Sequence, residues 1–213
     1  VLEGYKEKKP DLWLLITYLE LSESHTSRTN YAQAKEILEK ARSLLNDIDL
    51  PNEKREAINL GVQIQFSSIY HAEKRYETAL DEIRHTHALF ENLEHKDIDN
   101  ELNILKLETE ILLELDQRDE ARTKLESIFA NIKSSWMEAT YWQLKGILEQ
   151  RDMNLGSAKK AFEQAINKSE EIGQYNLLIQ SRMMYAALLI DQAKLGNLLA
   201  YQSAEKYLID IEN

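Results

Sequence analysis

The chain has 213 residues, of which 43% are hydrophobic, so it can build a sizeable core and is not a disordered polypeptide. Only two prolines and six glycines interrupt it, which argues against an all-β fold, because strands and their turns need frequent Gly and Pro. The formal net charge is -11, which argues against direct contact with nucleic acid, since phosphate backbones are bound by basic surfaces.

The absence of cysteine excludes disulfide bonds, thiolate zinc sites and cysteine nucleophiles. No apolar run reaches the length of a membrane span and no signal peptide is visible, so we predict no membrane contact and a cytoplasmic location. The chain begins at Val1 and not at Met, so we expect it to be a fragment of a longer protein.

Nearly every segment has helical periodicity of its apolar residues. The first helix is expected after Pro10, and the third is expected to begin at Pro51, because proline suits a first helical turn. The expected helices cover residues 11–24, 31–45, 51–70, 76–93, 97–115, 118–132, 135–150, 155–172, 176–195 and 198–211. Most joins are short and polar, but we expect extended loops around residues 22–30 and 194–199.

One local pattern recurs in every second helix: an apolar or long residue, an alanine three positions later, and a large residue four positions after that. The five alanines are Ala34, Ala79, Ala121, Ala158 and Ala204, and their spacings are 45, 42, 37 and 46 residues. Such a recurrence is typical of stacked helical hairpins. Alanine at a crossing lets two helix backbones approach closely, and the large residue one turn later fills the next gap.

This pattern resembles the tetratricopeptide repeat family over nearly the whole chain. The best match to the family motif is Trp142, Gly146, Leu155, Ala158, Phe162 and Ala165. The second match is Phe66, Ser67, Tyr70, Tyr76, Ala79 and Ile83. In both matches a small residue of the first helix precedes the alanine of the second by twelve positions, and Thr109 and Ala121 have the same spacing.

The repeats depart from the family pattern because they are longer and lack its closing proline. Long repeats of this kind are similar to those of bacterial signalling proteins, such as transcription activators of the maltose-regulator type and peptide-sensing regulators of Gram-positive bacteria. The resemblance implies an all-α fold, a right-handed superhelix of about five stacked antiparallel helical hairpins in a single domain over residues 1–213. The repeats are expected near residues 11–50, 51–96, 97–133, 135–173 and 175–213.

The resemblance also implies a partner-binding groove lined by the first helices. The groove positions carried onto this chain are Ile64, Ser68, His71, Asn103, Lys106, Glu110, Gln143, Ile147, Gln150 and Arg151. The fifth repeat would add Met184, Leu188 and Asp191. These side chains mix apolar, amide and charged groups, which suits an extended peptide or a helix as the partner.

We find no pattern that indicates catalysis, a metal or a cofactor. His85 and His87 are two apart on a helix and point about 200° apart, so they do not share one ion. The other histidines are expected near helix ends, and no HExxH, phosphate-binding loop or GxSxG elbow is present. The aromatic residues Trp136, Tyr141 and Trp142 could form a stacking platform, but Trp142 is expected in the hairpin core.

The leading hypothesis is therefore a non-catalytic module that binds a protein, peptide or small ligand and regulates an attached effector domain, as in signalling or transcription regulation. The alternative is a structural scaffold that mediates oligomerisation or complex assembly. That alternative rests on the segment 201–211, whose apolar face has no following helix to cover it. An enzyme is the least favoured class, because function is argued from sites and no catalytic site is evident.

Overall fold

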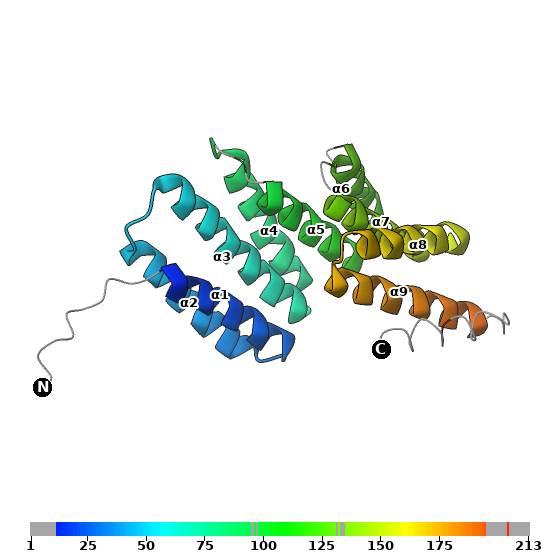
Figure 1. Cartoon of the computed structure of the whole chain (residues 1–213), viewed down its shortest axis with the longest axis horizontal. Coiled ribbons are helices and arrows are strands. Elements are labelled where there is room, and N and C mark those ends of the chain that lie inside the picture. The colour runs from blue at the N-terminus through cyan, green and yellow to red at the C-terminus, as the bar shows by residue number, and fades with distance from the viewer. Residues whose placement is uncertain are drawn as a thin grey trace, which may run out of the picture. The chain divides into compact units, whose positions relative to one another are not determined.

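A computed structural model describes residues 12–94, 96, 98–130, 132, 135–194 and 204, and these residues form nine main α-helices and no strand (Figure 1). The helices are α1 (Leu12–Ser27), α2 (Tyr31–Asp47), α3 (Asn52–Ala72), α4 (Tyr76–Glu91), α5 (Ile98–Glu114), α6 (Arg118–Ala130), α7 (Ser135–Arg151), α8 (Leu155–Glu171) and α9 (Tyr175–Lys194). The all-helical prediction is therefore confirmed. The expected helix over 198–211 lies outside the described residues, apart from Ala204.

The first nine predicted helices agree with the structure to within three residues at each end. The extended loop predicted around Ser22–Asn30 is wrong, because α1 continues to Ser27 and only residues 28–30 connect it to α2. The hydroxyls of Thr26 and Ser27 each donate to a carbonyl four residues earlier in the helix, at 2.9 and 3.0 Å. Serine and threonine, which often favour turns, are accommodated here inside a helix by this local bonding.

The same sharp turn joins several helices. The second residue before a new helix has a positive φ near 60° at Thr29, Lys74, Asp116, Met153 and Gly173. The next backbone N–H reaches back five residues, as from Arg75 to the Tyr70 carbonyl and from Asn154 to the Glu149 carbonyl, both at 2.9 Å. This closure is a Schellman motif, which satisfies carbonyls that the helix end would leave without partners.

The chain divides after Leu115 into two compact units, of which the first holds α1 to α5. In this unit each helix packs on the next, and α1 also contacts α3 while α3 contacts α5. Buried Ser22 donates its hydroxyl to the Ala34 carbonyl of α2 at 3.0 Å, so a small residue again stands twelve positions before the alanine. In the α3–α4 pair, Ser67, Ala79 and Ile83 are buried in the corresponding places.

The second unit holds α6 to α9, in which α6 packs on α7, α7 on α8, α8 on α9, and α7 also on α9. A Cβ at Gly146 of α7 would lie 2.6 Å from the Phe162 ring of α8, so no other residue fits there without rearrangement. Phe162 is fully buried with Ala158, and Tyr185 of α9 packs in the same cluster. Burial of a phenylalanine stabilises a fold by about 1.5–3 kcal/mol, which explains why the close approach is tolerated.

Equivalent ion pairs connect successive helix pairs in the two units. In the first unit, Lys35 Nζ of α2 lies 2.6 Å from a carboxylate oxygen of Glu73, just after α3. In the second unit, Arg122 of α6 lies 2.5 Å from a carboxylate oxygen of Asp152, just after α7. Glu73 and Asp152 each stand directly before the residue of positive φ, so the two contacts are equivalent.

The third predicted repeat, over 97–133, includes α5 of the first unit and α6 of the second. Its small residue and its alanine, Thr109 and Ala121, are both buried. The pairing of α5 with α6 and the single domain over 1–213 stay predictions. Among the described helices, none is long and apolar enough to cross a membrane.

Candidate functional site

The predicted groove residues of the first unit lie on α3 and α5. Ile64, Ser68 and His71 on α3 are half-buried, and the His71 ring lies 5.6 Å from that of Tyr76. On α5, Asn103 is exposed, and Lys106 pairs with Glu110 one turn later at 3.8 Å. These side chains are therefore accessible in part, and their charges are balanced within α5.

The predicted groove residues of the second unit lie on α7. Ile147, Gln150 and Arg151 are half-buried, but Gln143 is only 1% exposed. The Gln143 amide donates to the buried hydroxyl of Ser181 on α9 at 3.3 Å. Gln143 thus holds α7 against α9 in this structure and presents no open side chain to a partner.

The fifth-repeat positions expected on α9 do not all reach the surface. Leu188 is fully buried in the α8–α9 core, Met184 is half-buried and Asp191 is exposed. The open apolar residues of α9 are instead Tyr175, Ile179 and Met183, which are 74%, 38% and 55% exposed. They are spaced four apart, so they share one helix face, which we call the α9 stripe.

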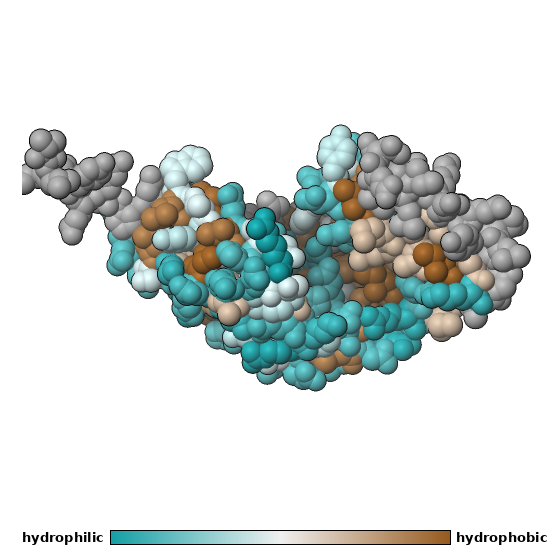
Figure 2. All heavy atoms as spheres, turned by 90° about the horizontal axis from the view of Figure 1, so that it is seen from below, coloured by the Kyte–Doolittle hydropathy of each residue, from teal (hydrophilic) through white to brown (hydrophobic). Residues whose placement is uncertain are grey.

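Figure 2 shows brown atoms in both halves of the picture, and those in the right half, together with tan atoms, lie on the face of the second unit turned to the viewer. The sequence reasoning missed the α9 stripe, because α9 is apolar almost all round and its periodicity does not single out the open face. The regular spacing of Tyr175, Ile179 and Met183 was the available signal.

A buried carboxylate joins α4 and α5 in the first unit. Glu108 Oε2 lies 3.1 Å from His87 Nδ1, and Glu108 Oε1 lies 3.8 Å from Arg84 Nε. Buried carboxylates are usually paired, and here both neighbours come from α4. The cluster therefore fixes the packing of α4 on α5.

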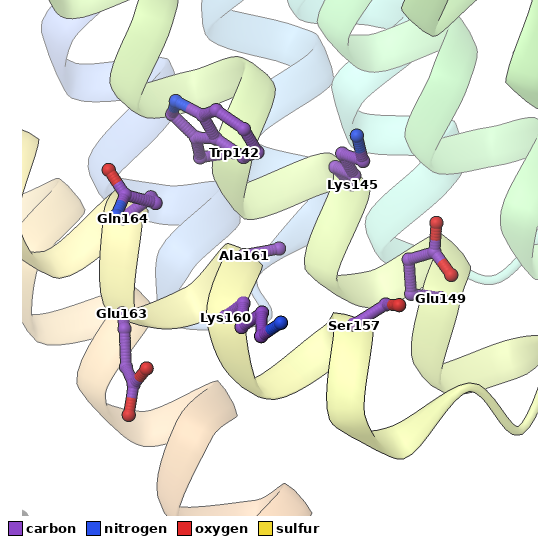
Figure 3. Close-up of a pocket in the computed structure, with 8 residues that line it drawn as sticks. All are labelled: Trp142, Lys145, Glu149, Ser157, Lys160, Ala161, Glu163 and Gln164. Carbon is purple, nitrogen blue, oxygen red and sulfur yellow. The ribbon is translucent and has the colours of Figure 1, made fainter.

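A pocket of about 430 Å³ lies between α7 and α8 in the second unit (Figure 3). From α7 it is lined by Trp142, Lys145 and Glu149. From α8 it is lined by Ser157, Lys160, Ala161, Glu163 and Gln164. Trp142 is half-buried against this space, so it is not the fully packed core residue that the sequence suggested.

A smaller hollow of about 170 Å³ lies between α6 and α7. It shares Lys145 and Glu149 with the α7–α8 pocket and is closed on its α6 side by Arg122, Leu125 and Glu126. The Tyr141 ring lies edge-on to Trp142, with ring centres 5.1 Å apart. The aromatic residues of α7 therefore form the wall between two neighbouring hollows.

Within the described part of the chain, no three His, Asp or Glu side chains are grouped so that they could hold a metal ion. The α7–α8 pocket has the size of a small-molecule site, since such sites commonly measure about 300–1,000 Å³. Its side chains can bind and orient a ligand by stacking, hydrogen bonding and charge. They do not form a nucleophile–base pair.

Comparison with known proteins gives no family for this chain: no family model matches it, and no curated protein matches it significantly.

Proposed function

We propose that the chain is a non-catalytic module of tetratricopeptide type, which binds a protein or peptide along its first helices. In this proposal the helix pairs stack into a right-handed superhelix. The module serves as a sensing or regulatory domain of a larger bacterial protein for signalling or transcription regulation. The likeness of its repeats to those of such regulators motivates that context.

The observation that carries the proposal is an asymmetry in the packing of alternate helices. The first helix of one pair contacts the first helix of the next pair, as α1 does with α3, α3 with α5, and α7 with α9. Within the described ranges, the second helices α2 and α4 make no such contact, and neither do α6 and α8. When the first helices of successive pairs lie closer together than the second helices do, the stack is curved. The first helices then line its inner, concave surface.

The chemistry of the first helices suits a polypeptide partner. Ile64 and Ile147 offer apolar contacts, and Asn103 and Gln150 offer amide hydrogen bonds. Lys106 and Glu110 offer charges of both signs. Partly exposed groups of these mixed kinds recognise an extended peptide or a helix through side-chain contacts.

Site-specific photo-crosslinking in cells that naturally contain the protein tests this proposal. A benzophenone amino acid would replace Ile64, Lys106 or Ile147 on first helices and, as controls, Lys40 or Asn167 on exposed faces of second helices. We expect one and the same partner to be crosslinked from the first helices only. Crosslinks from the second helices alone, or from no position, would contradict the proposal.

The α9 stripe favours a second candidate function, a scaffold that self-associates. Three large apolar side chains on one exposed face make an interface site, because such contiguous patches are uncommon on monomers. Light scattering should then show a dimer that the Met183→Lys variant disperses, while Gln180→Lys on the same helix leaves it intact. A monomer at all concentrations rules out self-association.

A further inference from the structure

Gly61 lies on the face of α3 that the proposed binding of a partner would use. At 100° per residue, it lies about 60° around the helix axis from Ile64 and about 20° from Ser68. It stands six residues before the buried small residue of its helix, as Asn103 does in α5. The first helices α1 and α5 each contact α3. Gly61 is therefore on the middle one of the three first helices of the first unit.

The space over Gly61 is a hollow in the surface of the first unit. Gly61 is half-buried, so neighbouring groups shield it from solvent. Yet a Cβ at Gly61 would meet no heavy atom within 4 Å beyond the adjacent residues and the nearby backbone of its own helix. Gly156 also has open space around it, but it is exposed in the first turn of α8. Gly61 differs from it in being both shielded and empty.

Packing within the chain does not explain a glycine at this position. Gly61 lies in the middle of a 21-residue helix, where glycine is less favourable than alanine. At Gly146, by contrast, a Cβ would lie 2.6 Å from the Phe162 ring, so packing there requires glycine. Along α3 the hollow is bordered by Ala57 one turn before Gly61 and by Ile64 one turn after it. An apolar group from outside the chain would therefore gain contact with apolar side chains there.

The surface around the hollow is acidic. The first unit, residues 1–115, has 23 acidic and 14 basic side chains, so it carries -9 of the formal net charge of -11. Glu23 of α1 and Glu110 of α5 have the same place in their helices as Ser68 in α3, one residue after the small residue. Glu23 is exposed and makes no ion pair among the described residues, while Glu110 pairs with Lys106 at 3.8 Å. A positive charge on a partner is attracted to such a surface.

We propose that the first unit binds a polypeptide segment that carries one large apolar side chain close to a basic residue. The apolar side chain fills the hollow over Gly61, and the basic residue meets the carboxylate of Glu23. This inference rests on the proposed binding of a polypeptide along the first helices, and it names what that polypeptide presents to them. An apolar anchor supplies affinity, and a complementary charge beside it supplies specificity.

Selection from a random peptide library on the immobilised chain tests the proposal. The enriched peptides are synthesised with a fluorescent label, and each Kd is measured by anisotropy. We expect these peptides to share a Leu, Phe or Trp with a Lys or Arg within about three residues, and to bind with a Kd below about 100 μM. Gly61→Leu fills the hollow and should weaken binding at least about tenfold. Gly156→Leu, the matched change at the open glycine of α8, should leave the Kd unchanged.

A smaller change keeps the test decisive even where Gly61→Leu does not fold. Gly61→Ala should be at least as stable in urea as the unchanged chain, because alanine favours a helix and its Cβ meets no neighbour. It should still weaken peptide binding about threefold or more, because the methyl group takes part of the hollow.

A charge reversal tests the basic residue of the partner. Glu23→Lys should weaken peptide binding about fivefold or more, and the loss should shrink in 1 M salt. Asp81→Lys, the same change of charge on the exposed face of the second helix α4, should change the Kd by less than about twofold.

Three results would overturn the proposal. They are the enrichment of no peptide, equal binding of the enriched peptides to the unchanged chain and to folded Gly61 variants, and enrichment of acidic peptides that Glu23→Lys does not weaken. Photo-crosslinking from Ile64, Lys106 and Ile147 is measured separately in cells. A partner crosslinked there, with peptide binding that ignores Gly61, would reject the hollow and leave the proposed function standing.

Discussion

The α3–α4 and α7–α8 helix pairs are built to one plan but differ where the helices cross. Both have a small residue twelve positions before a buried alanine, and both turn through a residue of positive φ. Both also place an acidic residue before that turn to meet a cation of the preceding helix. At the crossing of α7–α8, Gly146 lies against Phe162, whereas the equivalent positions of α3–α4 hold buried Ser67 and Ile83.

This difference shows that the crossing is set jointly by two positions. A large ring on the second helix is accommodated only where the first helix has no Cβ. Ser67 has room for its own hydroxyl, which donates to the Gln63 carbonyl in the same helix at 3.1 Å. The twelve-residue spacing therefore identifies the crossing, while the pair of side chains decides how close the helices come.

The largest expected effect is an unequal response of the two crossings to alanine. Gly146→Ala should destabilise the fold by about 1–3 kcal/mol, because its Cβ collides with the Phe162 ring. Ser67→Ala should change stability by less than about 0.5 kcal/mol, because alanine fits and favours the helix. Urea unfolding of both variants measures the difference.

Two controls accompany this comparison. Gly156→Ala, at a helical glycine with open space around it, should stabilise by up to about 1 kcal/mol. In the double variant Gly146→Ala/Phe162→Leu, the smaller side chain should relieve part of the collision and give a coupling energy of about 1 kcal/mol. Equal losses for Gly146→Ala and Ser67→Ala would contradict the account of the crossings.

Substitutions in the turns of the two helix pairs should change stability by similar and smaller amounts. Lys74 and Met153 both have positive φ, which costs an L-residue about 1 kcal/mol, so Lys74→Gly and Met153→Gly should each stabilise by up to that amount. Gly173 has the same backbone conformation, and Gly173→Ala should destabilise by about 1 kcal/mol. Thermal unfolding measures all three, and a lower melting temperature for Met153→Gly would show that its side chain matters more than its backbone.

The ion pairs between successive helix pairs should contribute less. Lys35→Met and Arg122→Met should each cost about 0.2–1 kcal/mol, because the cations are partly exposed and water screens them. The loss should shrink in 1 M salt, where the Debye length falls to about 3 Å. Lys40→Met, which removes an exposed ion pair within α2, serves as the matched control and should cost less than either.

The smallest expected effects are on the pH dependence of stability. One should occur at alkaline pH and the other at acid pH. Hydrogen bonds from Lys168 to Glu171 and to Glu138 of α7 raise the pKa of Lys168. A raised pKa means that this stabilisation is complete below the unfolded value of about 10.4 and is lost as pH rises through the folded pKa. As pH rises above 10, the free energy of unfolding should therefore fall less for the Lys168→Met variant than for the unchanged chain. Denaturant unfolding measures this difference.

At the end of α4 the dependence is reversed. A hydrogen bond from Lys96 lowers the pKa of Glu91, so its contribution is present above the unfolded value of about 4.3 and is lost as pH falls through the folded pKa. The Glu91→Gln variant should flatten the acid limb of the stability curve and leave the alkaline limb unchanged. A change confined to the alkaline limb would contradict this assignment.

The sequence was sufficient for the helices and for the crossings, because both depend on local spacing. Gly146, Ala158 and Phe162 were identified from their positions alone, and the structure places them in contact or in one core. Ser22 was missed, although it precedes Ala34 by the same twelve residues. It was overlooked because the serines and threonines around it favour a loop, whereas the structure uses their hydroxyls within the helix and across to α2.

The exposure of individual side chains was harder to predict, because it depends on the angle at which α9 packs on α7 and α8. That angle buries Gln143 and Leu188 and leaves Ile179 exposed. The α7–α8 pocket was missed for a related reason. It exists because Ala161 is small opposite Trp142, and the two residues come from different helices.

Hydrogen exchange of the chain with its crosslinked partner, identified and purified, tests the proposed function most directly. We predict slower exchange in α3, α5 and α7, at the surfaces of Ile64, Lys106 and Ile147, and unchanged exchange in α2 and α8. Protection confined to α2 and α8, or no protection in any described helix, would contradict binding along the first helices.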